Sequence, residues 1–305
     1  MSQTENKQGQ VETTGHVWDG DLREYNNPLP RWWLWAFYVT IVFSVVYWIL
    51  YPAWPYGDTY TKGINTVEYT VEEDGEEKTV SEHWNTRALF TRDMQSSPSA
   101  MAQDEWTDKV KDMSFEEIEQ DPDTLQFAMS MGNYTFGDYC AACHGAGGQG
   151  KVGLFPNLAD NDWLYGNSYE TIVDKINNGI KGNMPAQNVA EDKIDDLATY
   201  VLSLSGEAEI SGEAASRGKE AFSSCAGCHG AEGKGNQSMG APNLTDAIWD
   251  VADVPGCGDD TACKVDEIKH VVNNGIKREM PAFGDRLTET QARMLAIYVR
   301  QMGGN

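Results

Sequence analysis

Cys140-Ala-Ala-Cys143-His144 is repeated as Cys225-Ala-Gly-Cys228-His229, and this pair of pentapeptides decides the fold of the 305-residue chain. Two thiols at this spacing form thioethers to the two vinyl groups of one haem, and the histidine that follows lies under the iron as its proximal ligand. Structural zinc sites and thioredoxin-like redox motifs also use Cys-x-x-Cys, but neither requires a histidine directly after the second cysteine. The two copies therefore predict two covalently bound haem c groups.

The surroundings of the two pentapeptides also repeat. Each is followed by Pro-Asn-Leu, a tryptophan, Asn-Asn-Gly-Ile-Lys, Met-Pro-Ala and Leu-Ala-x-Tyr-Val, in the same order. These segments begin at Pro156, Trp163, Asn177, Met184 and Leu197 in the first copy, and at Pro242, Trp249, Asn273, Met280 and Leu295 in the second. An internal repeat of this kind predicts two tandem modules, residues 126–206 and 211–303.

Each module resembles the class I cytochrome c fold, in which a few helices surround one haem and the first helix crosses the last. The resemblance predicts the ends of the first helices at Gly132–Tyr139 and Gly218–Phe222, and the last helices at Ile194–Leu204 and Thr290–Met302, where apolar residues recur at helical spacing. A module this short buries too little side-chain surface alone, so the haem supplies much of its apolar interior. The predicted fold class is mainly α, with one N-terminal transmembrane helix followed by two tandem class I cytochrome c domains.

Met184 and Met280 are the candidate sixth ligands. They are the methionines at matching places in both repeats, and each precedes a proline that stiffens its loop. A thioether favours ferrous iron and raises the reduction potential of a histidine-ligated haem. The alternative is a pair of ordinary core methionines. Pairing within each module is the default, but closely packed modules could exchange these loops.

Other residues are weaker candidates. In the fold that the modules resemble, the carbonyl of a proline such as Pro156 or Pro242 accepts the N–H of the proximal histidine; the alternative is a proline that only ends a helix. His270 is a rival ligand, but its counterpart in the first repeat is Asp174, which favours a solvated helix face. His16 and His83 lie in charged, unrepeated segments and are expected at the surface.

Cys257 and Cys263 lie in an insertion that only the second repeat has. Thioether attachment of haem takes place outside the cytoplasm, where disulfides persist. A local disulfide is therefore expected, and two free thiols are the alternative.

The stretch from Trp32 to Gly57 contains no charged residue. Its apolar core of about twenty residues spans roughly 30 Å as a helix, which matches one bilayer core. Aromatic residues gather at its two ends, as at membrane interfaces: Trp32, Trp33, Trp48, Tyr51 and Trp54. A cleaved signal peptide fits poorly after thirty polar residues, and a buried core helix is the remaining alternative. A transmembrane helix is predicted over residues 31–55.

The haem sites set the predicted orientation. Haem is attached outside the cytoplasm, so residues 1–30 would face the cytoplasm and the chain from residue 56 onward the periplasm, with a single pass through the bacterial inner membrane. The connector, residues 56–125, contains a predicted hairpin in which Val67–Val71 and Lys78–Val80 flank an Asp-Gly turn. Further on, Ser114 and Glu117 predict a capping box at the start of a short acidic helix. The connector is either a partner site or a solvated spacer.

The segment around the anchor carries a narrower resemblance. Trp18–Gly20, Asn26–Trp33 and Tyr47–Pro52 are similar to the N-terminal anchor of the di-haem subunit of cbb3-type cytochrome c oxidases, the CcoP/FixP family. The resemblance implies an electron-transfer subunit without catalysis of its own, which works with a catalytic haem–copper subunit, a mono-haem cytochrome c subunit and a donor cytochrome c. The formal net charge of −24 excludes nucleic acid as a partner and favours a basic donor.

Two other classes stay open on the sequence alone. One is a di-haem cytochrome that serves a periplasmic dehydrogenase. The other is a haem peroxidase or gas sensor, which requires a displaceable sixth ligand on one iron.

Overall fold

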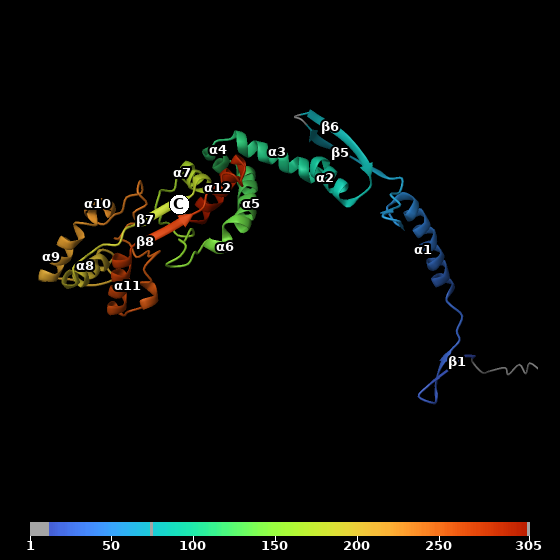
Figure 1. The fold of residues 1–305 in the computed structure, drawn as a ribbon, viewed down its shortest axis with the longest axis horizontal. Helices are drawn as coiled ribbons and strands as arrows, with labels where there is room; N and C mark the ends of the chain where they lie inside the picture. Colours follow the sequence, from blue (N-terminus) through green and yellow to red (C-terminus); the bar gives the residue numbers. More distant parts are fainter. Residues whose placement is uncertain (1–11, 74–75, 304–305) are drawn as a thin grey trace, which may run out of the picture. The chain divides into compact units, whose positions relative to one another are not determined.

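The computed structural model describes residues 12–73 and 76–303, and the chain forms two compact units, Met1–Ala102 and Gln103–Asn305 (Figure 1). The described part of the first unit contains three small antiparallel hairpins, two complete helices and the start of a third. These elements are β1 (Thr13–Trp18), β2 (Leu22–Tyr25), α1 (Arg31–Leu50), β3 (Pro55–Tyr56), β4 (Thr59–Tyr60), β5 (Thr66–Glu73), β6 (Glu76–His83) and α2 (Thr86–Ser96). Helix α3 (Pro98–Asp112) contains the boundary between the units.

Helix α1 is the candidate membrane span. It is 20 residues long, has a mean hydropathy of 1.9, and has no residue buried against the described part of the chain, unlike the core helix of a soluble domain. The helix ends at Leu50, five residues before the predicted end at 55, because Tyr51 is extended ahead of Pro52. At 1.5 Å per residue, its length still matches roughly 30 Å of hydrocarbon.

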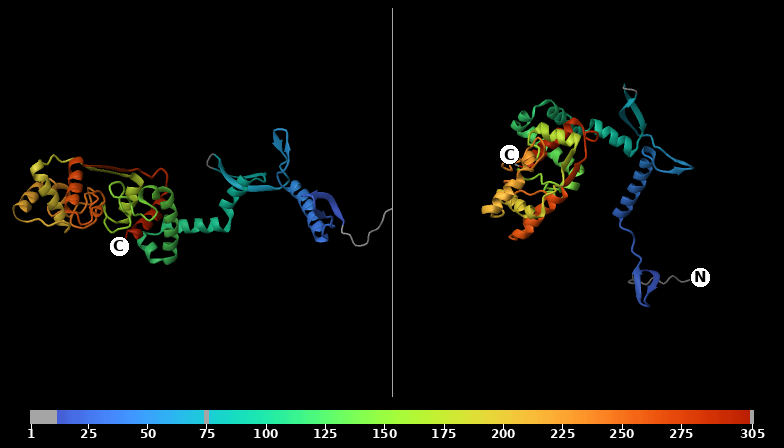
Figure 2. Two further views of the ribbon diagram at one scale, coloured as in Figure 1. Left: turned by 90° about the horizontal axis from the view of Figure 1, so that it is seen from below. Right: turned by 60° about the vertical axis from the view of Figure 1, so that its left-hand side comes forward.

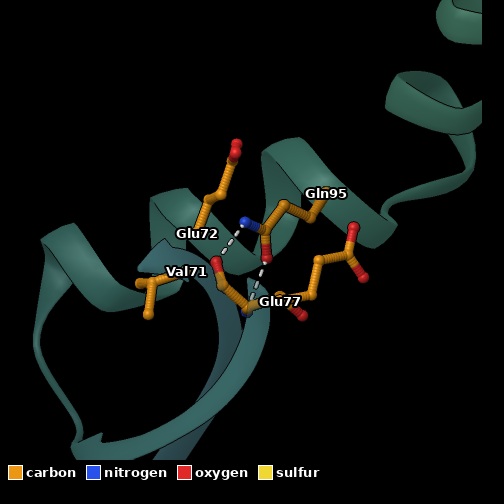
Figure 3. Close-up of a pocket in the computed structure, with 5 residues that line it drawn as sticks. Val71, Glu72, Glu77 and Gln95 are labelled. Atoms are coloured by element: carbon orange, nitrogen blue, oxygen red, sulfur yellow. Dashed lines mark hydrogen bonds between the residues drawn. The ribbon is translucent and has the colours of Figure 1, made fainter. Parts of the chain in front are cut away.

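The predicted connector hairpin is confirmed as β5 and β6, which pair from Thr66↔His83 to Glu73↔Glu76. The predicted turn residues, Asp74 and Gly75, lie outside the described residues. Helix α2 is held to β5 by the amide of Gln95, which accepts from the Thr70 N–H (2.9 Å) and donates to the Thr70 carbonyl (2.7 Å) (Figure 3). The depression beside this contact is lined by Glu72 and Glu77 and contains none of the predicted haem ligands.

The second unit contains both haem-attachment motifs. Its elements are α4 (Phe115–Gln120), α5 (Pro122–Tyr139), α6 (Ala141–His144), α7 (Tyr169–Asn178), β7 (Ile180–Met184), α8 (Glu191–Leu204), α9 (Gly212–Phe222), α10 (Ala226–His229), the 3₁₀ helix η1 (Pro255–Cys257), α11 (Thr261–Asn274), β8 (Ile276–Met280) and α12 (Glu289–Met302). The predicted capping box is present at the start of α4, where Ser114 and Glu117 each accept from the other's backbone N–H. Mainly helical architecture is therefore confirmed.

The helices pack across the two repeats. The last helix, α12, packs on α5 and α7 of the first repeat, whereas α8 of the first repeat packs on α9 and α11 of the second. Both views in Figure 2 show α12, at the red end of the colour scale, beside the green helix α5. We call the α5, α6, α7 and α12 group the first core, and the α8, α9, α10 and α11 group the second core.

The two cores have separate apolar interiors. Phe136, Ile176 and Leu295 belong to the first, and Leu197, Phe222 and Ile268 to the second. The antiparallel pair β7–β8 connects them, with Ile180 opposite Met280 and Met184 opposite Ile276. The second core is thus a contiguous stretch of chain between these strands, inserted into the first.

The cores therefore differ from the predicted contiguous modules, residues 126–206 and 211–303. Helix α8 lies within the first repeat and α12 within the second, yet each packs in the other core. The physical reason is the repeat itself: both last helices carry the same Leu-Ala-x-Tyr-Val face, so either can fill either core. The crossing of β7 and β8 decides which one does.

Candidate haem-binding sites

Each Cys-x-x-Cys-His motif forms a single helical turn. The His144 N–H donates to the Cys140 carbonyl (2.9 Å), and the equivalent bond from His229 to Cys225 is 3.0 Å. All four motif cysteines are free thiols in the described structure, the first of each pair half-buried and the second exposed. Burial raises the pKa of Cys140 to about 11, so this thiol is neutral until it is alkylated. Each turn therefore places two cysteines at the spacing that thioether formation requires.

The histidine of each motif is oriented by a proline carbonyl. His144 Nδ1 lies 3.1 Å from the Pro156 carbonyl oxygen, and His229 Nδ1 lies 3.1 Å from that of Pro242. Because a carbonyl only accepts, Nδ1 carries the proton and Nε2 presents its lone pair, which is the form that ligates a metal. Burial lowers the pKa of His144, which further favours the neutral ring. Both prolines therefore accept the hydrogen bond that orients the histidine ring, and neither merely ends a helix.

Two buried indoles support the fit of a haem in each core. Trp163 Nε1 and Trp249 Nε1 are buried, and neither has a hydrogen-bond partner among the described residues. An unpaired buried N–H is costly, and the same donor is orphaned at the same place in both repeats. A haem carries propionate carboxylates that would accept from such donors. In the sequence, the two tryptophans could be recognised only as part of the repeat. Their possible role as hydrogen-bond donors follows from the burial of the indole nitrogens, which only the structure shows.

The two candidate methionines lie at the ends of β7 and β8, and both are half-buried. Met280 packs against the first core together with Cys140 and Leu158. Met280 is one of several methionines in the first core, which also includes the Cys140–His144 turn, so the donor types that a haem c takes are all present there.

The remaining candidates lie away from these sites. His270 is exposed on α11 and hydrogen-bonded to Asn274 (3.1 Å), which places it on the predicted solvated face. His16 and His83 are exposed on β1 and β6. Cys257 and Cys263 form a disulfide with a Cα–Cα distance of 5.6 Å, as expected. Within residues 12–73 and 76–303, no cluster of three or more His, Cys, Asp or Glu side chains suggests another metal site.

An acidic cluster lies where loops of the two cores meet. Asp250 accepts from the Asn157 N–H (3.3 Å), and its carbonyl accepts from Arg278 (3.0 Å). Burial, together with Asp246, Asp250 and Asp160, raises the pKa of Asp162 to about 6.

The fold and these sites define a c-type cytochrome in which the haem-attachment motif occurs twice. Residues 10–58 match the family model described as the N-terminal domain of cytochrome oxidase-cbb3, FixP, and residues 128–201 and 213–299 match cytochrome c oxidase, cbb3-type, subunit III. The chain is similar to the cbb3-type cytochrome c oxidase subunit FixP of Azorhizobium caulinodans, at 41% identity over 97% of this chain and 94% of that one. It is also similar to the CcoP subunits of Azospirillum sp. (39%; 96% of each chain) and Cereibacter sphaeroides (36%; 99% of this chain and 98% of that one).

The chain belongs to the CcoP/FixP family of cbb3-type cytochrome c oxidase subunits. The resemblance inferred from the anchor segment is confirmed. Membership favours the oxidase subunit over the dehydrogenase cytochrome and over the peroxidase or gas sensor.

Proposed function

We propose that the chain is the membrane-anchored di-haem electron-transfer subunit of a cbb3-type haem–copper oxidase, and that it passes electrons from a donor cytochrome c toward the oxygen-reducing subunit. The observation that carries the proposal is the doubled site: two Cys-x-x-Cys-His turns, each with its imidazole held by a proline carbonyl at 3.1 Å. Family membership over nearly the whole chain supports the same function.

The residues have defined roles in this proposal. Cys140 and Cys143 form the thioethers of one haem and Cys225 and Cys228 those of the other, while His144 and His229 are the proximal ligands. Met184 and Met280 supply the sixth ligands. The bound iron supplies a one-electron change between ferric and ferrous states. Because protein atoms take both axial positions, the chain offers no open site to a substrate and performs no bond chemistry alone.

Helix α1 anchors the chain in the bacterial inner membrane as a single pass. The chain after α1 lies in the periplasm in this proposal, because covalent haem attachment takes place outside the cytoplasm and the Cys257–Cys263 disulfide persists in an oxidising compartment. Residues before Arg31 then face the cytoplasm.

The proposed partners are a catalytic haem–copper subunit, a mono-haem cytochrome c subunit and a donor cytochrome c. The net charge of −24 supports a basic donor, which is attracted over a distance that salt screening shortens. Electron delivery is therefore expected to slow as ionic strength rises.

Haem counting tests the proposal directly. The purified chain is expected to contain two covalent haems by pyridine haemochrome assay and by mass after denaturation. Cys140→Ser with Cys143→Ser leaves one haem, and so does Cys225→Ser with Cys228→Ser. The matched control, Cys257→Ser with Cys263→Ser, keeps both because these thiols lie outside the motifs. A colourless chain, or one with a single haem, contradicts the proposal.

A further inference from the structure

The chain turns back onto the C-terminal end of α1 soon after leaving it. The last carbonyls of a helix have no partner within the helix. Here the Ile64 N–H donates to the Ile49 carbonyl (3.1 Å), and the next N–H, that of Asn65, donates to the Leu50 carbonyl (3.0 Å). Gly63 permits this approach, because it has φ +73° and a Cβ there would lie 2.6 Å from the Leu50 carbonyl carbon. The segment that follows α1 is therefore fixed to the end of the helix.

The β3–β4 hairpin forms most of this segment. Next to its paired strands, the Thr61 N–H donates to the Trp54 carbonyl (2.8 Å), and the Trp54 N–H donates to the Thr61 hydroxyl (2.9 Å). The indole of Trp54 also packs against that of Trp48 in the last turn of α1, with ring centroids 4.8 Å apart. We call residues 53–64 the α1 collar, because they are joined to the helix end by backbone bonds and by ring packing.

The α1 collar exposes large side chains to its surroundings. Trp54 and Tyr60 are each 52% exposed, Ile64 is 69% exposed and Tyr56 is 79% exposed. Exposed apolar groups that gather in one place mark an interaction surface. Tryptophan and tyrosine combine an apolar ring with a polar tip, and they are enriched where hydrocarbon meets water at a membrane surface.

The position of the α1 collar selects lipid as its partner. Twenty helical residues cover roughly 30 Å, which is the full hydrocarbon thickness, so the chain leaves the hydrocarbon near Leu50. The headgroup layer beyond it is about 5–8 Å deep, and a hairpin fixed to Leu50 lies in that layer. Open strand edges are excluded from hydrocarbon but find partners among headgroups and water. In agreement, the first charged residue after Arg31 is Asp58, at the turn of the hairpin.

We propose that the α1 collar is a membrane-interface element, in which Trp54, Tyr56 and Tyr60 insert among the lipid headgroups at the C-terminal end of α1. These rings fix the depth of the helix end, because moving α1 along its axis would carry them into hydrocarbon or into water. The collar also holds the base of the β5–β6 hairpin at the membrane surface, since the Trp84 N–H donates to the Asn65 carbonyl (2.8 Å). The contact with lipid requires no haem.

A nitroxide spin label on the α1 collar measures its depth in the full chain. Thr59→Cys keeps every aromatic residue of the collar, and Thr59 is exposed. In the mature chain this is the one free thiol, because the motif cysteines are then thioethers and Cys257 is bonded to Cys263. In nanodiscs of phosphatidylethanolamine and phosphatidylglycerol, EPR power saturation is expected to show that this label is readily reached by oxygen. A water-soluble nickel chelate should reach it severalfold less than the same label on Thr79→Cys, the matched control on β6.

Removing two rings tests what holds the collar in place. In the Thr59→Cys chain, Tyr56→Ser with Tyr60→Ser is expected to raise nickel accessibility toward that of the Thr79 label. Tyr134→Ser, which removes an exposed tyrosine of α5, leaves it unchanged. Equal nickel accessibility at positions 59 and 79 of the parent chain overturns the proposal, as does a double tyrosine variant whose label does not move. A Thr59 label shielded from both oxygen and nickel overturns it too, because protein rather than lipid then covers the collar.

Discussion

Gly132 of α5 lies directly against Tyr298 of α12, where the first and last helices of the first core cross. A Cβ at position 132 would lie 2.6 Å from Tyr298 Cβ and 2.5 Å from the Met294 carbonyl oxygen. Gly218 of α9 meets Tyr200 of α8 in the same way, with a Cβ distance of 2.7 Å. Each crossing joins one helix from each repeat, so the two repeats depend on each other for their packing.

Gly132→Ala is expected to destabilise the first core by about 1–3 kcal/mol, because the added methyl group must displace the backbone at Met294 and the Cβ of Tyr298. Urea unfolding of the detergent-solubilised chain, followed by haem absorbance, measures the effect. The control is Gly137→Ala on the same helix, where a Cβ has nothing within 4 Å. For that variant, the higher helix propensity of alanine is expected to raise the free energy of unfolding by up to about 1 kcal/mol. Equal unfolding midpoints for the two variants would show that the crossing is not close-packed.

Trp163→Phe is expected to keep the fold and to alter the first haem alone. The indole Nε1–H is buried without a partner among the described residues, and a haem propionate is the acceptor that we expect for it. Loss of a donor to a carboxylate raises the pKa of that carboxylate. The pH at which the potential of this haem begins to change should therefore shift upward in a spectroscopic redox titration. Trp249→Phe should produce the same shift at the second haem, and no shift in either variant would exclude the hydrogen bond.

Asp162→Asn is expected to stabilise the second unit at neutral pH and to have little effect below about pH 4. Burial raises the pKa of Asp162 from 3.8 to about 6. The folded chain then binds this proton more tightly than the unfolded chain, so stability is lost as the pH rises through that window. Thermal unfolding at pH 4 and pH 7 measures the difference.

Asp174→Asn serves as a control, because its expected effect on stability at neutral pH is opposite to that of Asp162→Asn. Hydrogen bonds from Lys175 and Asn178 lower the pKa of Asp174, so its contribution is present at neutral pH and is lost as the pH falls. Removing it should destabilise the chain at pH 7. If both variants move stability in the same direction, the raised pKa of Asp162 is wrong.

Cys257→Ser with Cys263→Ser is expected to cost about 2 kcal/mol of stability in the second core, which is the chain-entropy estimate for so short a loop. The two cysteines are six positions apart and lie in η1 and α11. Urea unfolding with and without reductant measures the effect, and reductant should change the parent chain but not the double variant. A stability unchanged by reductant in both would contradict the estimate.

Local features of the structure were readable from the sequence because each depends on residues close together in the chain. The Cys140–His144 turn, the capping box of Ser114 and Glu117, and the β5–β6 hairpin all need contacts over a few positions. The membrane helix was readable from its length and apolarity, although Pro52 ends it earlier than predicted.

The exchange of helices could not be read in the same way. Tyr200 and Tyr298 occupy equivalent positions in the repeats, so the sequence pattern assigns either one to Gly132 equally well. Which pairing forms depends on how β7 and β8 cross, and their register joins residues as far as one hundred positions apart, as with Ile180 and Met280. The orphaned indole nitrogens were hidden for a related reason, because burial follows only from the packed core.

The insertion of one core into the other has a consequence for biosynthesis. A ribosome completes the inserted core when it has made α11, whereas the outer core waits for α12, the final helix of the chain. The second Cys-x-x-Cys-His motif therefore belongs to the part that can fold first, and the first motif to the part that can fold last. The core that contains the later motif can thus be completed before the core that contains the earlier one, and a nascent chain truncated before Glu289 would lack a structural element of its earlier site rather than of its later one.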